Sequence, residues 1–208
     1  MKAFGQFMYL GWWWARAVLG RRKPLQSVIF ISDRCNLSCK HCSVYNHTAP
    51  VDKSYAQIRE ELEYCYSLGS RFIDFEGGEP FLWRDGERTV NDLCRLARSI
   101  GFFSCTITTN AQMPFDGSVA DSIWVSMDGV GEYHERIRGK GTFERLEKNV
   151  AVCGCKALSA NMAINVENCD SVAAAIEYVA ASPYFKCISL NFHTPFPGTE
   201  YLEVPHDK

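Results

Sequence analysis

Residues 27–42 read SVIFISDRCNLSCKHC, and this stretch determines how the rest of the chain is interpreted. Its first half, Ser27-Val28-Ile29-Phe30-Ile31-Ser32, is an apolar run that predicts a buried strand. Its second half is a polar loop that carries Cys35, Cys39 and Cys42. A [4Fe–4S] cluster normally takes four cysteines, one per iron. Three thiolates on one loop would therefore leave one iron open to bind another molecule.

Two other interpretations of the three cysteines remain open. One is a zinc site with His41 or His47 as the fourth ligand, although structural zinc usually joins two separated pairs of ligands. The other is a set of unrelated buried thiols, which the polar character of the loop disfavours. The spacing favours an iron–sulfur centre, with a non-catalytic iron–sulfur or zinc-binding module as the alternative to an enzyme.

The composition indicates a globular chain in a reducing environment. A length of 208 residues suits one domain with a small appendage, and 47% hydrophobic and 13% aromatic residues can bury a large core. The formal net charge of -2 gives no signal for a nucleic-acid partner. Outside the loop, the cysteines are not spaced as in disulfide-rich domains, so we expect a cytoplasmic protein.

The amino-terminal segment 1–24 is aromatic and basic, and we expect it to be a helical unit distinct from a core domain over residues 25–208. It contains Trp12-Trp13-Trp14 and ends near Arg21-Arg22-Lys23. It is too short and too interrupted for a confident membrane span and lacks the features of a signal peptide. Two interpretations of residues 1–23 remain, a peripheral contact with a membrane surface and a cap over one end of the core domain.

The rest of the chain alternates between strand-like and helix-like segments. The patterns predict strands over 27–32, 72–75, 103–108, 122–126, 161–166 and 187–192, and helices over 53–68, 87–100, 142–153 and 171–181. This alternation indicates an α/β fold with a parallel sheet and outer helices, which places ligands at the carboxyl ends of the strands. The chain stops at Lys208 without a sixth helix, so we expect either a carboxyl-terminal truncation or another cover for the last strand.

Two motifs at the ends of the first two predicted strands resemble those of the radical S-adenosylmethionine (radical SAM) enzymes. They are the Cys35-x-x-x-Cys39-x-x-Cys42 loop and Gly77-Gly78-Glu79-Pro80, and the resemblance covers roughly residues 25–195. It implies a partial (β/α)6 TIM-like barrel that binds a [4Fe–4S] cluster and S-adenosylmethionine. It further implies reductive cleavage of that cofactor to a 5′-deoxyadenosyl radical that abstracts hydrogen from a substrate. Oxygen sensitivity and a reductant such as ferredoxin or flavodoxin are also implied.

The resemblance also implies roles for individual residues. The three cysteines would ligate the cluster, and the cofactor would contact His41, Gly77, Gly78, Glu79, Pro80, Asn110, Ser126, Asp128 and Arg138. In this assignment Glu79 offers a carboxylate to the methionyl amino group, Ser126 and Asp128 contact the ribose, and Arg138 faces the methionyl carboxylate. Asn110 matches the asparagine of a third-strand motif, although Ala111 stands where the family has glycine.

The substrate cannot be read in the same way. Asn191 and His193, at the end of the last predicted strand, are our candidates for substrate contacts at the barrel mouth. The amino-terminal segment suggests a lipid-like substrate, and a peptide is the competing class.

Overall fold

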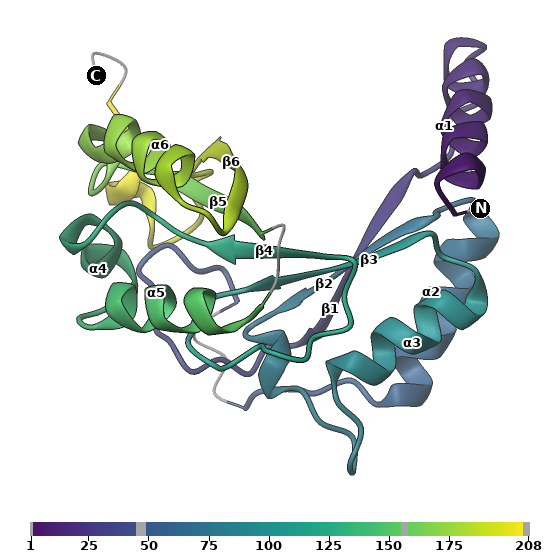
Figure 1. Cartoon of the computed structure of the whole chain (residues 1–208), viewed down its shortest axis with the longest axis horizontal. Coiled ribbons are helices and arrows are strands. Elements are labelled where there is room, and N and C mark those ends of the chain that lie inside the picture. Colours follow the sequence, from purple (N-terminus) through teal and green to yellow (C-terminus); the bar gives the residue numbers. More distant parts are fainter. Residues whose placement is uncertain (1, 45–48, 155–157, 206–208) are drawn as a thin grey trace.

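A computed structural model of the chain describes residues 2–44, 49–154 and 158–205, and it contains one six-stranded sheet (Figure 1). The strands follow one another in sequence order, and each pairs in parallel with the next. They are β1 (Gln26–Ser32), β2 (Phe72–Gly77), β3 (Ser104–Thr109), β4 (Ser122–Ser126), β5 (Leu158–Ile164) and β6 (Phe185–Phe192). The predicted α/β partial barrel with a parallel sheet is confirmed.

Helices cover the outer face of this sheet and form two apolar clusters with it. They are α2 (Tyr55–Leu68), α3 (Val90–Ile100), α5 (Thr142–Val152) and α6 (Val172–Ala181), while the short helix α4 (Glu132–Arg138), between β4 and α5, belongs to neither cluster. One cluster joins the first three strands to α2 and α3, and the other joins β4 and β5 to α5 and α6. Burial of this outer face leaves the inner face of the barrel for chemistry.

Local signals explain where α2 begins and ends. Ser54 accepts a hydrogen bond from the backbone of Gln57, whose side chain bonds back to Ser54, so a complete capping box starts the helix. Gly69 ends it at φ 112°, as the sequence predicts.

Alternation along the strands decides which residues face the inside of the barrel. On β2, Ile73 and Phe75 are buried in the outer core, so Asp74 and Glu76 point to the inner face. The parallel register places Asp74 opposite Val28 and Thr106, and Ser126 opposite Asn161. Most of this inner face is therefore polar.

Several elements differ from the predicted bounds by one to three residues; α3, for example, begins at Val90 and not at residue 87. The fifth strand is Leu158–Ile164, three residues earlier than expected at its start, because Leu158 pairs with Ile123 of β4. The helix α4 was not predicted, since it has only seven residues and lies between Gly131 and Gly139. Tertiary pairing and packing therefore outweigh local propensity for β5 and α4.

The amino-terminal helix α1 (Lys2–Val18) packs against the end of the barrel where the strands begin (Figure 1). Gln6 donates a hydrogen bond to the carbonyl of Phe103, and the Tyr9 hydroxyl donates to the carbonyl of Gly69. The predicted helix is thus present, and one of its faces is attached to the core. Among the described residues, no helix is long and apolar enough to cross a membrane.

The opposite face of α1 is uncovered and apolar. The exposed fractions are 75% for Phe7, 65% for Trp14 and 66% for Val18. These residues lie four, seven and eleven positions apart and therefore share one side of the helix. Among the described helices and strands, α1 carries the most exposed large apolar side chains.

Candidate active site

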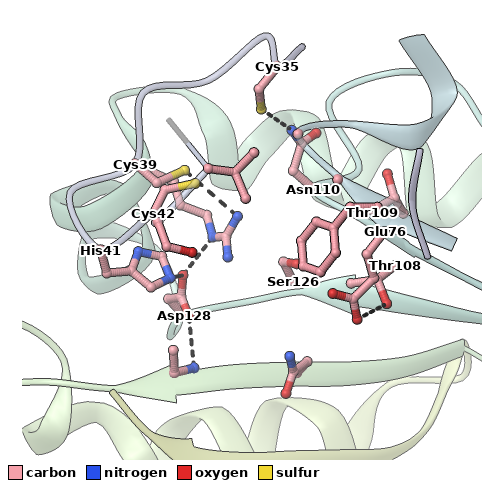
Figure 2. Close-up of a pocket in the computed structure, with 18 residues that line it drawn as sticks. Cys35, Cys39, His41, Cys42, Glu76, Thr108, Thr109, Asn110, Ser126 and Asp128 are labelled. Carbon is pink, nitrogen blue, oxygen red and sulfur yellow. Dashed lines mark hydrogen bonds and ion pairs between the residues drawn. The ribbon is translucent and has the colours of Figure 1, made fainter. Parts of the chain in front are cut away.

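A cavity of about 370 Å³ lies at the carboxyl ends of the strands and gathers most of the predicted site residues (Figure 2). Its lining includes Cys35, Cys39, His41, Cys42, Gly77, Gly78, Asn110, Ser126, Asp128 and Arg138. Glu79 and Pro80 belong to the adjoining turn and are buried. Asn191 and His193 are not part of the lining.

The loop after β2 is joined to the start of the cysteine loop by backbone hydrogen bonds. The Gly78 amide donates to the carbonyl of Ser32 at 2.8 Å, and the Glu79 amide donates to that of Arg34 at 2.8 Å. A Cβ at Gly77 would overlap the carbonyl of Ser32, and one at Gly78 would overlap that of Arg34. The paired glycines are therefore required by the contact that positions Cys35.

The three thiols enter the cavity from different sides. In Figure 2, Cys35 lies next to Asn110, and Cys39 and Cys42 lie on the side of Asp128. In the described part of the chain, no three histidine, cysteine or acidic side chains are close enough to bind one metal ion. Because thiolates around a cubane bind different irons, they lie further apart than the roughly 4 Å between ligands of one zinc. The arrangement therefore fits a cluster better than zinc; His47 lies outside the described residues.

The thiols lie in surroundings that disfavour charge. Burial raises the pKa of Cys39 to about 11 against the opposing effect of Arg138, and burial also raises the pKa of Cys35. Metal ligation requires the thiolate, so binding must release these protons. The Arg138 guanidinium, with Nη1 3.9 Å from the Cys39 sulfur, favours that ionisation.

Asp128 organises the other wall of the cavity. Its carboxylate is fully buried and accepts hydrogen bonds from Arg138 Nε at 2.6 Å and from the Ala163 amide at 3.0 Å. His41 Nε2 lies 3.4 Å from the same carboxylate. Burial alone would raise the pKa of Asp128, but Arg138, His41 and the Ala163 amide together offset it, and the pKa is lowered. This geometry favours Asp128 as the residue that fixes Arg138, and its predicted ribose contact stays a prediction.

His41 brings a polar atom without a protein partner to the cavity. Burial lowers its pKa, so the ring is largely neutral near pH 7. Its Nδ1 is buried and has no hydrogen-bond partner among the described residues. Because buried polar atoms are normally satisfied, this atom points to a ligand of the cavity.

Glu79 faces protein groups and not the cavity. Its carboxylate accepts hydrogen bonds from the amides of Phe81 and Asn110 and from the Thr109 hydroxyl. The Glu79 carboxylate is therefore held by protein groups and is not free to bind the methionyl amino group, as the resemblance had implied. Glu79 instead ties the turn after β2 to the turn after β3, where Ala111 adopts the left-handed φ of 57° that glycine prefers.

The two candidate substrate contacts lie near the cavity without lining it. The Asn191 side chain donates to Asn161 Oδ1 at 2.9 Å, and Asn161 is in the wall. The ring of His193 lies 6.2 Å from that of His41, centroid to centroid. Their predicted roles remain untested.

Sequence reasoning assigned no role to Asp74, Glu76 and Thr108, which lie on the inner wall. The Thr108 hydroxyl lies 3.3 and 3.4 Å from the two Asp74 oxygens and 3.5 Å from Glu76 Oε1. Burial, and next the charge of Glu76, raise the pKa of Asp74 to about 7. The sequence pattern that could have identified the two acidic residues is the alternation Phe72-Ile73-Asp74-Phe75-Glu76. In it the acidic residues occupy the strand face opposite to the core.

Comparison with known proteins identifies the family. The profile of the Radical SAM superfamily matches residues 29–158, which is more than half of the chain. The chain therefore belongs to the radical SAM superfamily, whose members are enzymes that use a [4Fe–4S] cluster and S-adenosylmethionine.

Particular relatives share part of their length with this chain. The AdoMet-dependent heme synthase of Oleidesulfovibrio alaskensis is 28% identical over 132 residues, 58% of this chain and 32% of the relative. The probable GTP 3',8-cyclase of Methanothermobacter marburgensis is 30% identical over 159 residues, 69% of this chain and 50% of the relative. The chain thus spans between a third and a half of these proteins.

Solved structures confirm the fold at low sequence identity. SuiB of Streptococcus suis bound to S-adenosylmethionine superposes with a TM-score of 0.70 at 18% identity, covering 88% of this chain and 44% of SuiB. Methylornithine synthase (PylB) superposes with a TM-score of 0.65 at 16% identity, covering 93% of this chain and 60% of PylB. Both are similar to this chain in fold.

Replacement of Gly78 tests the contact between the two loops. The Gly78→Ala variant is expected to lose about 1–3 kcal/mol of unfolding free energy and most of its reconstituted iron, because the new methyl group must displace the cysteine loop. Chemical denaturation and iron analysis measure both effects. The control is Gly11→Ala, since nothing lies within 4 Å of a Cβ there. Full iron content in Gly78→Ala would contradict the prediction.

The raised pKa of Asp74 predicts a pH dependence of stability. Between about pH 4 and pH 7 the folded protein keeps a proton that the unfolded chain has released, so the unfolding free energy falls as pH rises. Asp74→Asn removes this loss and is expected to be more stable than the wild type at pH 8 by about 1 kcal/mol or more. Denaturation at pH 5 and pH 8, with Asp116→Asn as an exposed control, measures the difference. Parallel pH profiles would refute it.

Proposed function

We propose that this chain cleaves S-adenosylmethionine reductively and directs the resulting radical to a substrate in the barrel. The observation that carries the proposal is the cavity in which three thiols, too dispersed for one metal ion, face the Arg138–Asp128 pair. When bound there, a reduced [4Fe–4S] cluster supplies the electron that converts the cofactor to methionine and a 5′-deoxyadenosyl radical. Ferredoxin or flavodoxin is the proposed electron donor.

The residues that line the cavity would divide the binding of the two cofactors. Cys35, Cys39 and Cys42 would hold three irons and leave the fourth open. The backbone of the Gly77-Gly78 turn would receive the methionyl amino group, and Arg138 its carboxylate, because guanidinium and carboxylate pair favourably. Ser126, Asn110 and His41 would contact the nucleoside. Glu79, Pro80 and Asp128 would shape and fix these groups from behind.

Reconstitution without oxygen tests the proposed chemistry. The wild type is expected to bind iron and sulfide, to show a reducible cluster spectrum, and to yield 5′-deoxyadenosine from S-adenosylmethionine and dithionite. The Cys39→Ala variant is expected to lose cluster and cleavage together, whereas Cys187→Ala, an exposed cysteine on β6, serves as the control. A colourless wild-type protein that holds only zinc would show that the chain is a non-catalytic metal-binding module.

The position of the amino-terminal helix argues against a lipid-like substrate and leaves a peptide as the proposed class. The helix α1 contacts Gly69 and Phe103, at the end of the barrel opposite to the cavity. A lipid held by α1 would therefore not reach the cavity directly. A peptide is the class bound by one structural neighbour, SuiB, which was solved with its precursor peptide SuiA.

For α1 we propose a separate role, the attachment of a cytoplasmic enzyme to an anionic membrane surface. Its uncovered face is apolar, and residues 1–32 contain five cations and no acidic residue. Exposed Arg21, Arg22 and Lys23 follow the helix directly. Apolar burial and attraction to anionic lipid together stabilise such interfacial helices. In this arrangement, residues 1–24 serve as a targeting unit for the core domain over 25–208.

Vesicle binding tests this attachment. The full chain is expected to sediment with vesicles that contain anionic lipid, less so at high salt, and the double variant Phe7→Ser/Trp14→Ser is expected to bind about tenfold more weakly. Tyr64→Ser, which removes an exposed aromatic ring from α2, is the matched control. Equal binding of the double variant and the wild type would exclude α1 as the contact.

A further inference from the structure

We propose that Asp74 and Glu76 form an anionic subsite on the inner wall of the barrel that binds a cationic nitrogen group of the substrate, an ammonium or a guanidinium. This inference rests on the proposed function, because it names the substrate chemistry of the same cavity. Figure 2 shows Glu76 beside Thr108 in the cavity wall. Asp74 lies one inward position deeper on β2 and is only 6% exposed.

The two carboxyl groups have too few hydrogen-bond donors. Among the described residues, the only donor to either carboxyl is the Thr108 hydroxyl, which lies 3.3–3.5 Å from three of their oxygens. A hydroxyl carries one proton and can serve one of these oxygens at a time. The remaining oxygens face the inside of the barrel without a protein donor, which is a costly arrangement at this depth.

Other buried carboxylates of the site have more hydrogen-bond donors. Glu79 accepts three hydrogen bonds, two of them from backbone amides. Asp128 is paired with Arg138 and also accepts from the Ala163 amide. The shortage of donors is therefore particular to the Asp74–Glu76 pair and does not reflect a general property of the cavity.

No cation of the described chain approaches the pair closely enough to neutralise it. On the inner face, Asp74 is flanked in register by Val28 and Thr106, and Glu76 is flanked by Phe30. The basic side chains of the cavity lining, the cationic Arg138 and the largely neutral His41, lie against Asp128 on the opposite wall. Above about pH 7, where Asp74 is ionised, a ligand group that enters this space would meet uncompensated negative charge.

The ligand that suits this subsite carries positive charge and at least two N–H donors. A primary ammonium offers three donors, and a guanidinium offers a planar fork that can bridge two carboxylates. A hydroxyl or amide would supply donors but leave the charge of the pair uncompensated. The apolar rings and methyl groups of Phe30 and Val28 would contact the carbon chain that carries the cation.

S-adenosylmethionine itself carries an ammonium and a sulfonium, so it is the competing source of the same charge. The proposed placement of its methionyl group at the Gly77-Gly78 turn and Arg138 directs its ammonium to backbone carbonyls and not to Asp74. The two sources predict different consequences when the carboxyl groups are neutralised. The experiment must therefore measure cofactor and amine binding separately.

The probes are n-butylamine and n-butylguanidine, with n-butanol as the neutral counterpart, titrated into reconstituted protein saturated with S-adenosylmethionine at pH 8. Ligand-observed NMR is expected to give saturable binding of both cations at about 1 mM and none of the alcohol. Asp74→Asn and Glu76→Gln are each expected to weaken binding about tenfold. Glu63→Gln, the same change on the exposed face of α2, should bind as the wild type does.

Four results would overturn the inference. The first is equal binding of cations and alcohol, and the second is unchanged cation binding in both inner-wall variants. The third is a tenfold loss of S-adenosylmethionine affinity in Glu76→Gln with cation binding retained, which would assign the charge to the cofactor. Failure of amine binding in a protein that still assembles its cluster and cleaves the cofactor would reject this subsite and leave the proposed function intact.

Discussion

The site depends on the close contact between the backbone after β2 and the backbone after β1. Two amide-to-carbonyl hydrogen bonds, from Gly78 to Ser32 and from Glu79 to Arg34, join the loops. A side chain at either glycine would separate them. The parallel register brings the two strand ends together, and this contact helps to fix Cys35 relative to the turn. Glu79 then extends the same constraint to β3 through its bond to the Asn110 amide.

The cavity has two walls of different electrostatic character. On one wall, Asp128, Arg138 and Cys39 form a chain of short contacts in which buried charges are compensated. On the other wall, Asp74 and Glu76 share a single hydroxyl. A compensated wall suits a cofactor that must be held in one geometry, whereas an uncompensated wall gains most from a ligand that brings its own charge. This asymmetry supports the proposal that one wall holds the cofactor and the other selects a substrate.

Much of this architecture could be predicted from the sequence because the signals were local. The apolar strands, the glycine that ends α2 and the cysteine spacing each act within a few residues. The roles of Asp128 and Glu79 could not be predicted in the same way, since their partners Arg138 and Asn110 are brought close only by the fold. The helix α4, which carries Arg138, has too few residues for a periodic pattern, and tertiary packing holds it in place.

The position of α1 makes its exposed surface independent of catalysis. Its attached face uses Gln6 and Tyr9 to bond backbone carbonyls at the start of the barrel, which leaves Phe7 and Trp14 outside. If these side chains served the stability of the fold, they would be buried against it, yet they are at least 65% exposed. The membrane surface proposed for α1 would cover them. Because the cavity opens at the opposite end, contact with that surface would leave the substrate path open.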